Sequence, residues 1–271
     1  MKIRVIAAVA LLPLLLIVLL FLPTVFTAVL FGLMAAIGAY ELLWGTGLVK
    51  QLRLIAYSAI LALLVPIWCH FGMPYAWLLV GMIALFVALF AEMLASGGKL
   101  PFEKVAICFA AGLLLPFLLS AIVRILEGEK GRFLVLIPFV LAFLSDSGAY
   151  FAGIFFGKHK LAPLISPKKT VEGVIGGVLG AILGMVLYCL VMQLAFRLEV
   201  NYIYAVIYGV LGSLAGVFGD LCFSVIKRQT GIKDYGSIFP GHGGVLDRFD
   251  SMVVVAPLAE VLLLTIPLAG V

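Results

Sequence analysis

The chain of 271 residues is 65% hydrophobic and 11% charged, and its formal net charge at pH 7 is +5. A soluble domain is about half apolar and about a quarter charged, so this composition excludes an ordinary water-soluble globule. Sequence this apolar fits the lipid bilayer, where helices satisfy their own backbone hydrogen bonds.

Apolar runs predict about nine transmembrane helices. The first run follows Met1-Lys2-Ile3-Arg4 and imitates a signal peptide, but it is long and lacks a clear cleavage site, so we expect an uncleaved span. Each run is close to the length of about 20 residues that crosses the hydrocarbon. The expected spans are Val5–Leu22, Thr24–Trp44, Leu54–Phe71, Tyr75–Leu94, Val105–Val123, Phe133–Phe156, Val174–Phe196, Tyr202–Ile226 and Met252–Leu268.

The predicted fold class is therefore an all-α, polytopic membrane bundle. We expect a single membrane-embedded domain over residues 1–271, in which residues 1–130 are mainly scaffold spans. Residues 131–271 hold most of the polar sequence and are expected to supply the catalytic spans and loops.

The basic residues predict the orientation. With the N-terminus in the cytoplasm and nine alternating spans, fourteen of the eighteen Lys and Arg residues fall on the cytoplasmic side. The positive-inside rule predicts such a bias. The two longest polar loops, Gly157–Gly173 and Lys227–Ser251, then face the cytoplasm. We expect a multi-pass protein of the inner (cytoplasmic) membrane with its active site on that side.

Carboxylates within spans are costly and commonly functional. Glu41 and Glu92 lie near expected cytoplasmic span ends, and we interpret them as interfacial anchors. Asp146 and Asp220 lie deeper in the cytoplasmic half of their spans. A function is the favoured interpretation of these two, and a structural buried ion pair is the alternative.

A polar helix face and a row of glycines occur in the expected spans of the second half of the chain. Asp220, Ser224 and Lys227 are spaced i, i+4, i+7 and share one helix face, which must meet protein or water. The seventh expected span carries a row of glycines from Gly173 to Gly184, which predicts close helix packing rather than a nucleotide loop.

The loop Lys227–Ser251 combines residue types that suit a metal–nucleotide complex. Its glycines permit positive φ and let backbone N–H groups face an anion. Asp247 and Asp250 share one helix face, and carboxylates are ligands that Mg²⁺ prefers. The cations suited to phosphates are Lys227, Arg228, Lys233 and Arg248. A basic loop lying on anionic lipid headgroups is the alternative, but it explains only the cations.

The stretch Ser224 to Asp250 resembles the signature of the phosphatidate cytidylyltransferase (CDP-diacylglycerol synthase) family. The matching residues are Ser224, Ile226, Lys227-Arg228, Lys233-Asp234, Gly236, Phe239-Pro240, His242-Gly243-Gly244, Val245 and Asp247-Arg248-Phe249-Asp250. A second block resembles the same family, with Asp146, Ala149-Tyr150-Phe151, Gly157-Lys158, Ser166-Pro167-Lys168-Lys169-Thr170 and Glu172-Gly173.

This resemblance implies transfer of CMP from CTP to phosphatidic acid, with pyrophosphate released and Mg²⁺ as cofactor. It carries metal binding onto Asp220 and Asp247, which we expect to share one Mg²⁺, with room for a second cation. Those two acids, Lys227, Arg228 and Asp250 form the expected catalytic set. The expected substrate-binding residues are Asp146, Lys168, Lys169, Ser224, Lys233, His242, Gly243, Gly244 and Arg248.

The expected partners are CTP, phosphatidic acid and the lipid bilayer; no nucleic acid is expected, and a homodimer is compatible with the sequence. Two other functions fit some of the same features. A CTP-dependent lipid kinase would need similar charges and metals. A transporter of an anionic substrate would use intramembrane acids and a basic funnel, but the sequence lacks paired broken helices in two symmetric halves.

Overall fold

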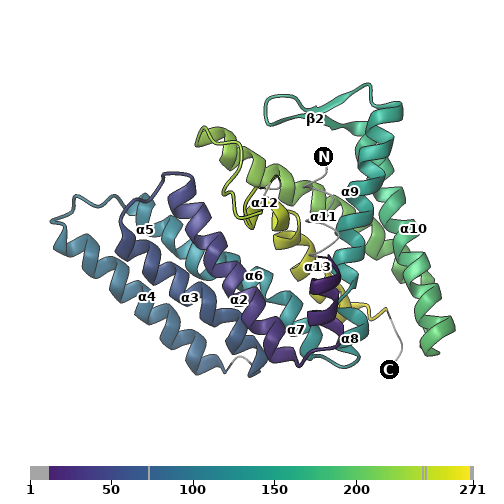
Figure 1. Cartoon of the computed structure of the whole chain (residues 1–271), viewed down its shortest axis with the longest axis horizontal. Coiled ribbons are helices and arrows are strands. Elements are labelled where there is room, and N and C mark those ends of the chain that lie inside the picture. The colour runs from purple at the N-terminus through teal and green to yellow at the C-terminus, as the bar shows by residue number, and fades with distance from the viewer. Residues whose placement is uncertain (1–11, 73, 240, 242, 269–271) are drawn as a thin grey trace. The chain divides into compact units, whose positions relative to one another are not determined.

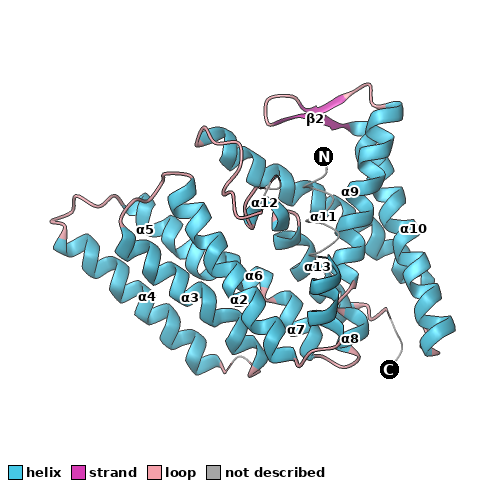
Figure 2. Ribbon diagram, viewed as in Figure 1, coloured by secondary structure: helices cyan, strands magenta, loops and turns pink. Residues whose placement is uncertain are grey.

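The computed structural model describes residues 12–72, 74–239, 241 and 243–268, and nearly all of its regular structure is helical (Figures 1 and 2). The chain forms two compact units. The first comprises Met1–Glu129 and Gln229–Phe249, and the second comprises Lys130–Arg228 and Asp250–Val271.

Seven helical segments within the described residues are long and apolar enough to cross a membrane, and each matches one expected span to within a few residues. They are Thr24–Gly45, Leu52–His70, Tyr75–Ala95, Phe102–Glu127, Gly131–Phe156, Val171–Phe196 and Tyr202–Gln229. These helices agree with the predicted polytopic, mainly helical membrane fold.

The first and last expected spans are less complete. The last corresponds to a shorter apolar helix, Met252–Thr265. Part of the first expected span, Val5–Leu22, lies outside the described residues, and residues 12–20 are helical. The total of nine spans and the side of the N-terminus stay predictions.

The first unit is built on helix α2, which passes without a break into the π-helical turn η1. Its elements are α2 (Thr24–Tyr40), η1 (Glu41–Gly45), α3 (Leu52–His70), α4 (Tyr75–Ala95), α5 (Phe102–Phe109), η2 (Ala110–Leu114), α6 (Leu115–Leu119), α7 (Ala121–Glu127) and α12 (Leu246–Phe249). The turn η2 ends just before Pro116, whose missing N–H removes the normal hydrogen bond to the carbonyl of Gly112. A local change to π-helical geometry accommodates this proline.

The second unit contains α8 (Gly131–Leu134), α9 (Ile137–Phe156), β1 (Lys160–Ala162), β2 (Ser166–Thr170), α10 (Val171–Phe196), α11 (Tyr202–Gln229) and α13 (Met252–Thr265). Helices α9 and α10 pack along the glycine row. A Cβ added at Gly180 would approach the carbonyl oxygen of Leu144 to 2.6 Å, and one at Gly177 would lie 3.1 Å from the Ser145 carbonyl oxygen. The predicted use of this row in helix packing is confirmed.

The loop Gly157–Gly173 contains an antiparallel hairpin that the sequence did not predict. Lys160 pairs with Thr170 and Ala162 pairs with Ser166 (Figure 2). Strand β2 leads directly into α10, so the polar segment is fixed to the end of a membrane helix.

Candidate active site

The polar segment between α11 and α12, residues 230–245, is called the signature loop. Two of its glycines adopt the left-handed conformation expected in tight turns, because φ is +76° at Gly241 and +85° at Gly243. The Phe239 N–H donates to the Gly243 carbonyl oxygen at 2.9 Å and closes one turn. Pro240 and His242 lie outside the described residues, so the substrate-binding role expected for His242 stays a prediction.

Asp247 binds the backbone of the signature loop at two separate positions. The residue is buried at the start of α12, and its Oδ2 accepts the N–H groups of Tyr235 at 2.7 Å and Gly244 at 3.0 Å. Both bonds are charge-assisted, and such bonds are roughly twice as strong as neutral ones. Carboxylate oxygens are also among the ligands that Mg²⁺ accepts.

Glu41 binds the backbone of the two residues that follow Gly244. Its side chain lies in η1, and its two oxygens accept the N–H groups of Val245 at 3.0 Å and Leu246 at 2.9 Å. The residue is only 2% exposed. Our interpretation of Glu41 as an interfacial anchor is therefore wrong, because the carboxylate binds the backbone rather than water.

These contacts also change the expected use of the glycine turn. We expected its N–H groups to face a bound anion. At Gly244, Val245 and Leu246 the anion is instead a carboxylate of the protein itself. The backbone is thus fixed from within the first unit.

In the second unit, Asp220 lies on α11 beside two residues of the predicted site. Its Oδ2 is 2.5 Å from Lys169 Nζ, and its Oδ1 accepts a hydrogen bond from Ser224 Oγ at 3.1 Å. The contact with Ser224 confirms that these two side chains share a helix face. Both members of the ion pair are partly shielded from solvent, with side chains 24% and 32% exposed.

A second acid lies near Asp220. Asp250 precedes α13, outside the long helices, and burial raises the pKa of its carboxyl from 3.8 to about 7. The negative charges of Asp220 and Asp146 contribute to this rise in the pKa, and the hydrogen bond from the Ser251 N–H and the positive charge of Lys227 oppose it. The acids from α9, α11 and the start of α13 are therefore close enough to interact electrostatically.

The donors present fit a magnesium ion by their chemistry. Mg²⁺ usually binds one or two carboxylates and completes its shell with water and substrate phosphates. Within the described residues, no group of three or more His, Cys, Asp or Glu side chains is arranged to hold a metal ion by itself.

The two expected phosphate ligands Lys168 and Lys169 lie on opposite faces of strand β2. Successive strand residues point to opposite faces. Lys169 is half-buried against Asp220, whereas Lys168 is exposed. Arg228 donates from Nε to the Ile165 carbonyl oxygen at 3.1 Å, so it also ties the hairpin to the end of α11. Lys233 and Arg248 are exposed.

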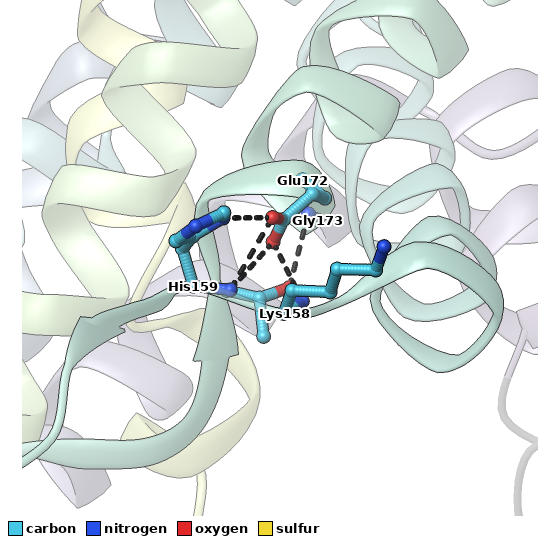
Figure 3. Close-up of polar contacts among 5 residues, drawn as sticks. Lys158, His159, Glu172 and Gly173 are labelled. Atoms are coloured by element: carbon cyan, nitrogen blue, oxygen red, sulfur yellow. Dashed lines mark hydrogen bonds and ion pairs between the residues drawn. The ribbon is translucent and has the colours of Figure 1, made fainter.

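Both ends of the hairpin are fixed at the start of α10 (Figure 3). The Glu172 carboxylate accepts the backbone N–H groups of Lys158 and His159 at 3.1 and 3.2 Å and lies 2.6 Å from His159 Nδ1. Thr170 caps the helix, since its Oγ1 accepts the Gly173 N–H at 3.1 Å. Thr170 and Glu172 lie in the second block that resembles the family, but no role was expected for either side chain.

The cap leads to a prediction on stability. Thr170→Ala removes the acceptor for Gly173 and is expected to lower the free energy of unfolding by about 1 kcal/mol, the usual cost of losing an N-cap. Thermal unfolding in detergent measures the change. Thr265→Ala is the matched control, because that exposed hydroxyl bonds to the Val261 carbonyl oxygen in its own helix. Equal unfolding temperatures for the two variants would contradict the capping role.

Comparison with known proteins identifies the family of the chain. The chain matches the cytidylyltransferase family over residues 2–266. A protein of Haemophilus influenzae named phosphatidate cytidylyltransferase is 38% identical over 154 residues, which is 55% of this chain and 54% of the relative. Proteins of the same name from Staphylococcus saprophyticus and Staphylococcus aureus are 40% and 41% identical over 138 residues.

Those two alignments cover 51% and 50% of this chain, and 52% and 51% of the relatives. In each of the three alignments the chain thus spans about half the length of the curated relative it matches. The family match, by contrast, includes almost every residue and contains both polar blocks. The chain therefore belongs to the cytidylyltransferase family.

Proposed function

We propose that this protein is a phosphatidate cytidylyltransferase, which transfers CMP from CTP to phosphatidic acid to give CDP-diacylglycerol and pyrophosphate in phospholipid biosynthesis. The observation that carries the proposal is the match from Ser224 to Asp250, in a chain that belongs to the cytidylyltransferase family. The names of the relatives support the same activity.

The reaction joins two anions. An oxygen of the phosphatidate phosphate attacks the α-phosphorus of CTP, the bond from that phosphorus to the bridging oxygen breaks, and pyrophosphate leaves. A phosphate monoester has a second pKa of about 6 and is largely dianionic at neutral pH, so it needs no strong general base. The enzyme must mainly position the reactants and offset their repulsion.

The side chains of the two polar blocks suit this task. Lys169 is held by Asp220 at the end of a membrane helix, and Arg228 retains further N–H donors besides the one used on Ile165. Arg binds phosphate in a bidentate manner, while Lys acts as a point charge. These cations would hold the phosphate groups of CTP and of the lipid.

Magnesium is the proposed cofactor, with Asp220 and Asp247 as its protein ligands, as the sequence predicts. The ion would neutralise charge on the nucleotide phosphates. The buried carboxylate of Asp247 and the partly buried carboxylate of Asp220 support this assignment by donor type. A second cation and a homodimer stay predictions.

We place the enzyme in the inner membrane with both polar loops in the cytoplasm, where CTP is made. The distribution of Lys and Arg supports this orientation. Single cysteines at Ser166 and Ser237, in a background without the native Cys69, Cys108, Cys189 and Cys222, should react with an impermeant thiol reagent only from the cytoplasmic side. Labelling from the periplasm of intact cells would reverse the orientation.

Acceptor dependence tests the proposed activity. Purified protein in mixed micelles with CTP and Mg²⁺ should release pyrophosphate with phosphatidic acid and not with diacylglycerol. A lipid kinase would instead consume diacylglycerol and form CDP. Turnover with neither lipid would favour the transporter, which an uptake assay in vesicles would then examine.

A further inference from the structure

We infer that Glu41 is a positioning residue for the signature loop, and that it acts on the proposed reaction through the backbone next to Asp247. The inference rests on the proposed function. Glu41 lies about 200 residues before the signature loop in the sequence and outside both blocks that resemble the family. Its carboxylate is nevertheless buried against the loop.

The first step of the argument is the pattern of hydrogen bonds. Two carboxylates together bind four backbone N–H groups around one turn. Asp247 binds those of Tyr235 and Gly244, and Glu41 binds those of Val245 and Leu246. Three of the four donors are consecutive residues directly before Asp247. The Glu41 contacts therefore fix the chain that carries the Asp247 side chain.

The second step is steric fit. A Cβ at either Gly236 or Gly244 would overlap the Glu41 carboxylate. Neither glycine has a positive φ, so the absence of a side chain, rather than backbone conformation, is what these positions require. The two glycines are thus explained by the space that the buried carboxylate occupies.

The third step is the packing of α2 and η1 against the signature loop and the start of α12. Gly38, Glu41 and Gly45 are spaced i, i+3, i+7. A Cβ at Gly45 would overlap the Tyr235 carbonyl oxygen, and one at Gly38 would lie 3.2 Å from Leu246 Cδ2. The end of α2 and the turn η1 therefore pack closely against the backbone of Tyr235 and the side chain of Leu246. π-Helical turns within α-helices frequently occur at functional sites.

Burial makes the arrangement sensitive to charge. A buried carboxylate is tolerated when hydrogen bonds replace its water, and here two N–H groups do so. Glu41→Gln keeps the size of the side chain but replaces one carboxylate oxygen with an NH₂ group. That group is a donor, so it cannot accept the N–H group of Val245 or Leu246 that it would face. The turn should then shift, and small displacements of reacting groups are known to lower rates by about 10²-fold.

The test compares Glu41→Gln with Glu92→Gln. Glu92 is another carboxylate of the first unit, which accepts a bond from Tyr57 and pairs with exposed Arg53 at 3.6 Å. We expect kcat/KM for CTP to fall about 10- to 100-fold in the Glu41 variant and to stay within twofold of wild type in the Glu92 variant.

Amide hydrogen exchange supplies a readout that does not depend on turnover. In the Glu41→Gln protein, peptides covering residues 235–247 should exchange faster while helices α3 and α4 keep the protection of wild type. Uniformly faster exchange would indicate a general loss of stability and overturn the positioning role. Unchanged exchange with normal kcat/KM would overturn it as well.

A double-mutant cycle with Gly236→Ala tests the contact itself. In wild type the new methyl group meets Glu41, so kcat/KM should fall about tenfold or more. In a Glu41→Ala background the methyl group has space, and the same change should cost less than about twofold, as expected for coupled contacts. Equal effects in both backgrounds would overturn the inference. If wild-type protein makes no CDP-lipid, the proposed function fails, and hydrogen exchange still decides the role of Glu41.

Discussion

Replacing Asp220 or Asp247 with Asn is expected to abolish nearly all cytidylyl transfer, with kcat lowered by roughly 10³-fold or more, the scale of losing a group that acts in the transition state. Asn keeps the shape of each side chain and removes its charge. At position 220 the change leaves Lys169 without its partner at 2.5 Å. At position 247 it weakens both bonds to the backbone of the signature loop.

The double variant provides the sharper result. If both acids serve one metal–nucleotide complex, the double variant should be little worse than either single one, because residues acting as a unit are not additive. Glu199→Gln, which changes an exposed carboxylate of the second unit, controls for loss of charge alone and should keep normal kcat. Near-normal turnover of the Asp220→Asn enzyme would mean that Asp220 serves only as a structural ion-pair partner of Lys169.

Lys169→Met should lower kcat/KM about 100- to 1000-fold, whereas Lys168→Met should cost about tenfold. Met keeps the length of the side chain and removes the charge. The structure gives the reason for the difference, since Lys169 is half-buried against Asp220 and Lys168 is exposed on β2. Initial rates over a range of CTP and phosphatidic acid concentrations measure both effects.

Comparison of the two lysines contains its own control, because the variants differ by one position and share the same hairpin. Hydrogen exchange across residues 158–173 should match wild type in both proteins. Equal losses in the two variants would mean that the pair contributes only general positive charge. Normal kcat/KM in both would leave the hairpin as an anchor for lipid headgroups.

The membrane helices were predictable because composition and length alone specify them. Seven expected spans match helices of the structure, and the glycine row of α10 packs as predicted. The hairpin was missed because strands of three and five residues carry too little periodic pattern to separate them from a loop. The hairpin is stabilised by contacts with residues at the start of α10, and the pattern of residues within the strands does not indicate these contacts.

The site was predictable only where residues lie close together in the sequence. The face shared by Asp220 and Ser224 follows from helical spacing and is confirmed. Glu41 was misinterpreted because its partners, Val245 and Leu246, are about 200 residues away. The available signal was a carboxylate within an apolar span, which by its cost alone indicates a specific partner.

The fate of each phosphate of CTP tests the proposed reaction most directly. Purified protein with phosphatidic acid and Mg²⁺ should be given CTP labelled at the α-phosphate or, separately, at the γ-phosphate, and the lipid fraction should be counted. We expect the α-label in the lipid, the γ-label in pyrophosphate, and neither transfer in the Asp220→Asn enzyme. Label from the γ-phosphate in the lipid, or from neither position, would contradict cytidylyl transfer.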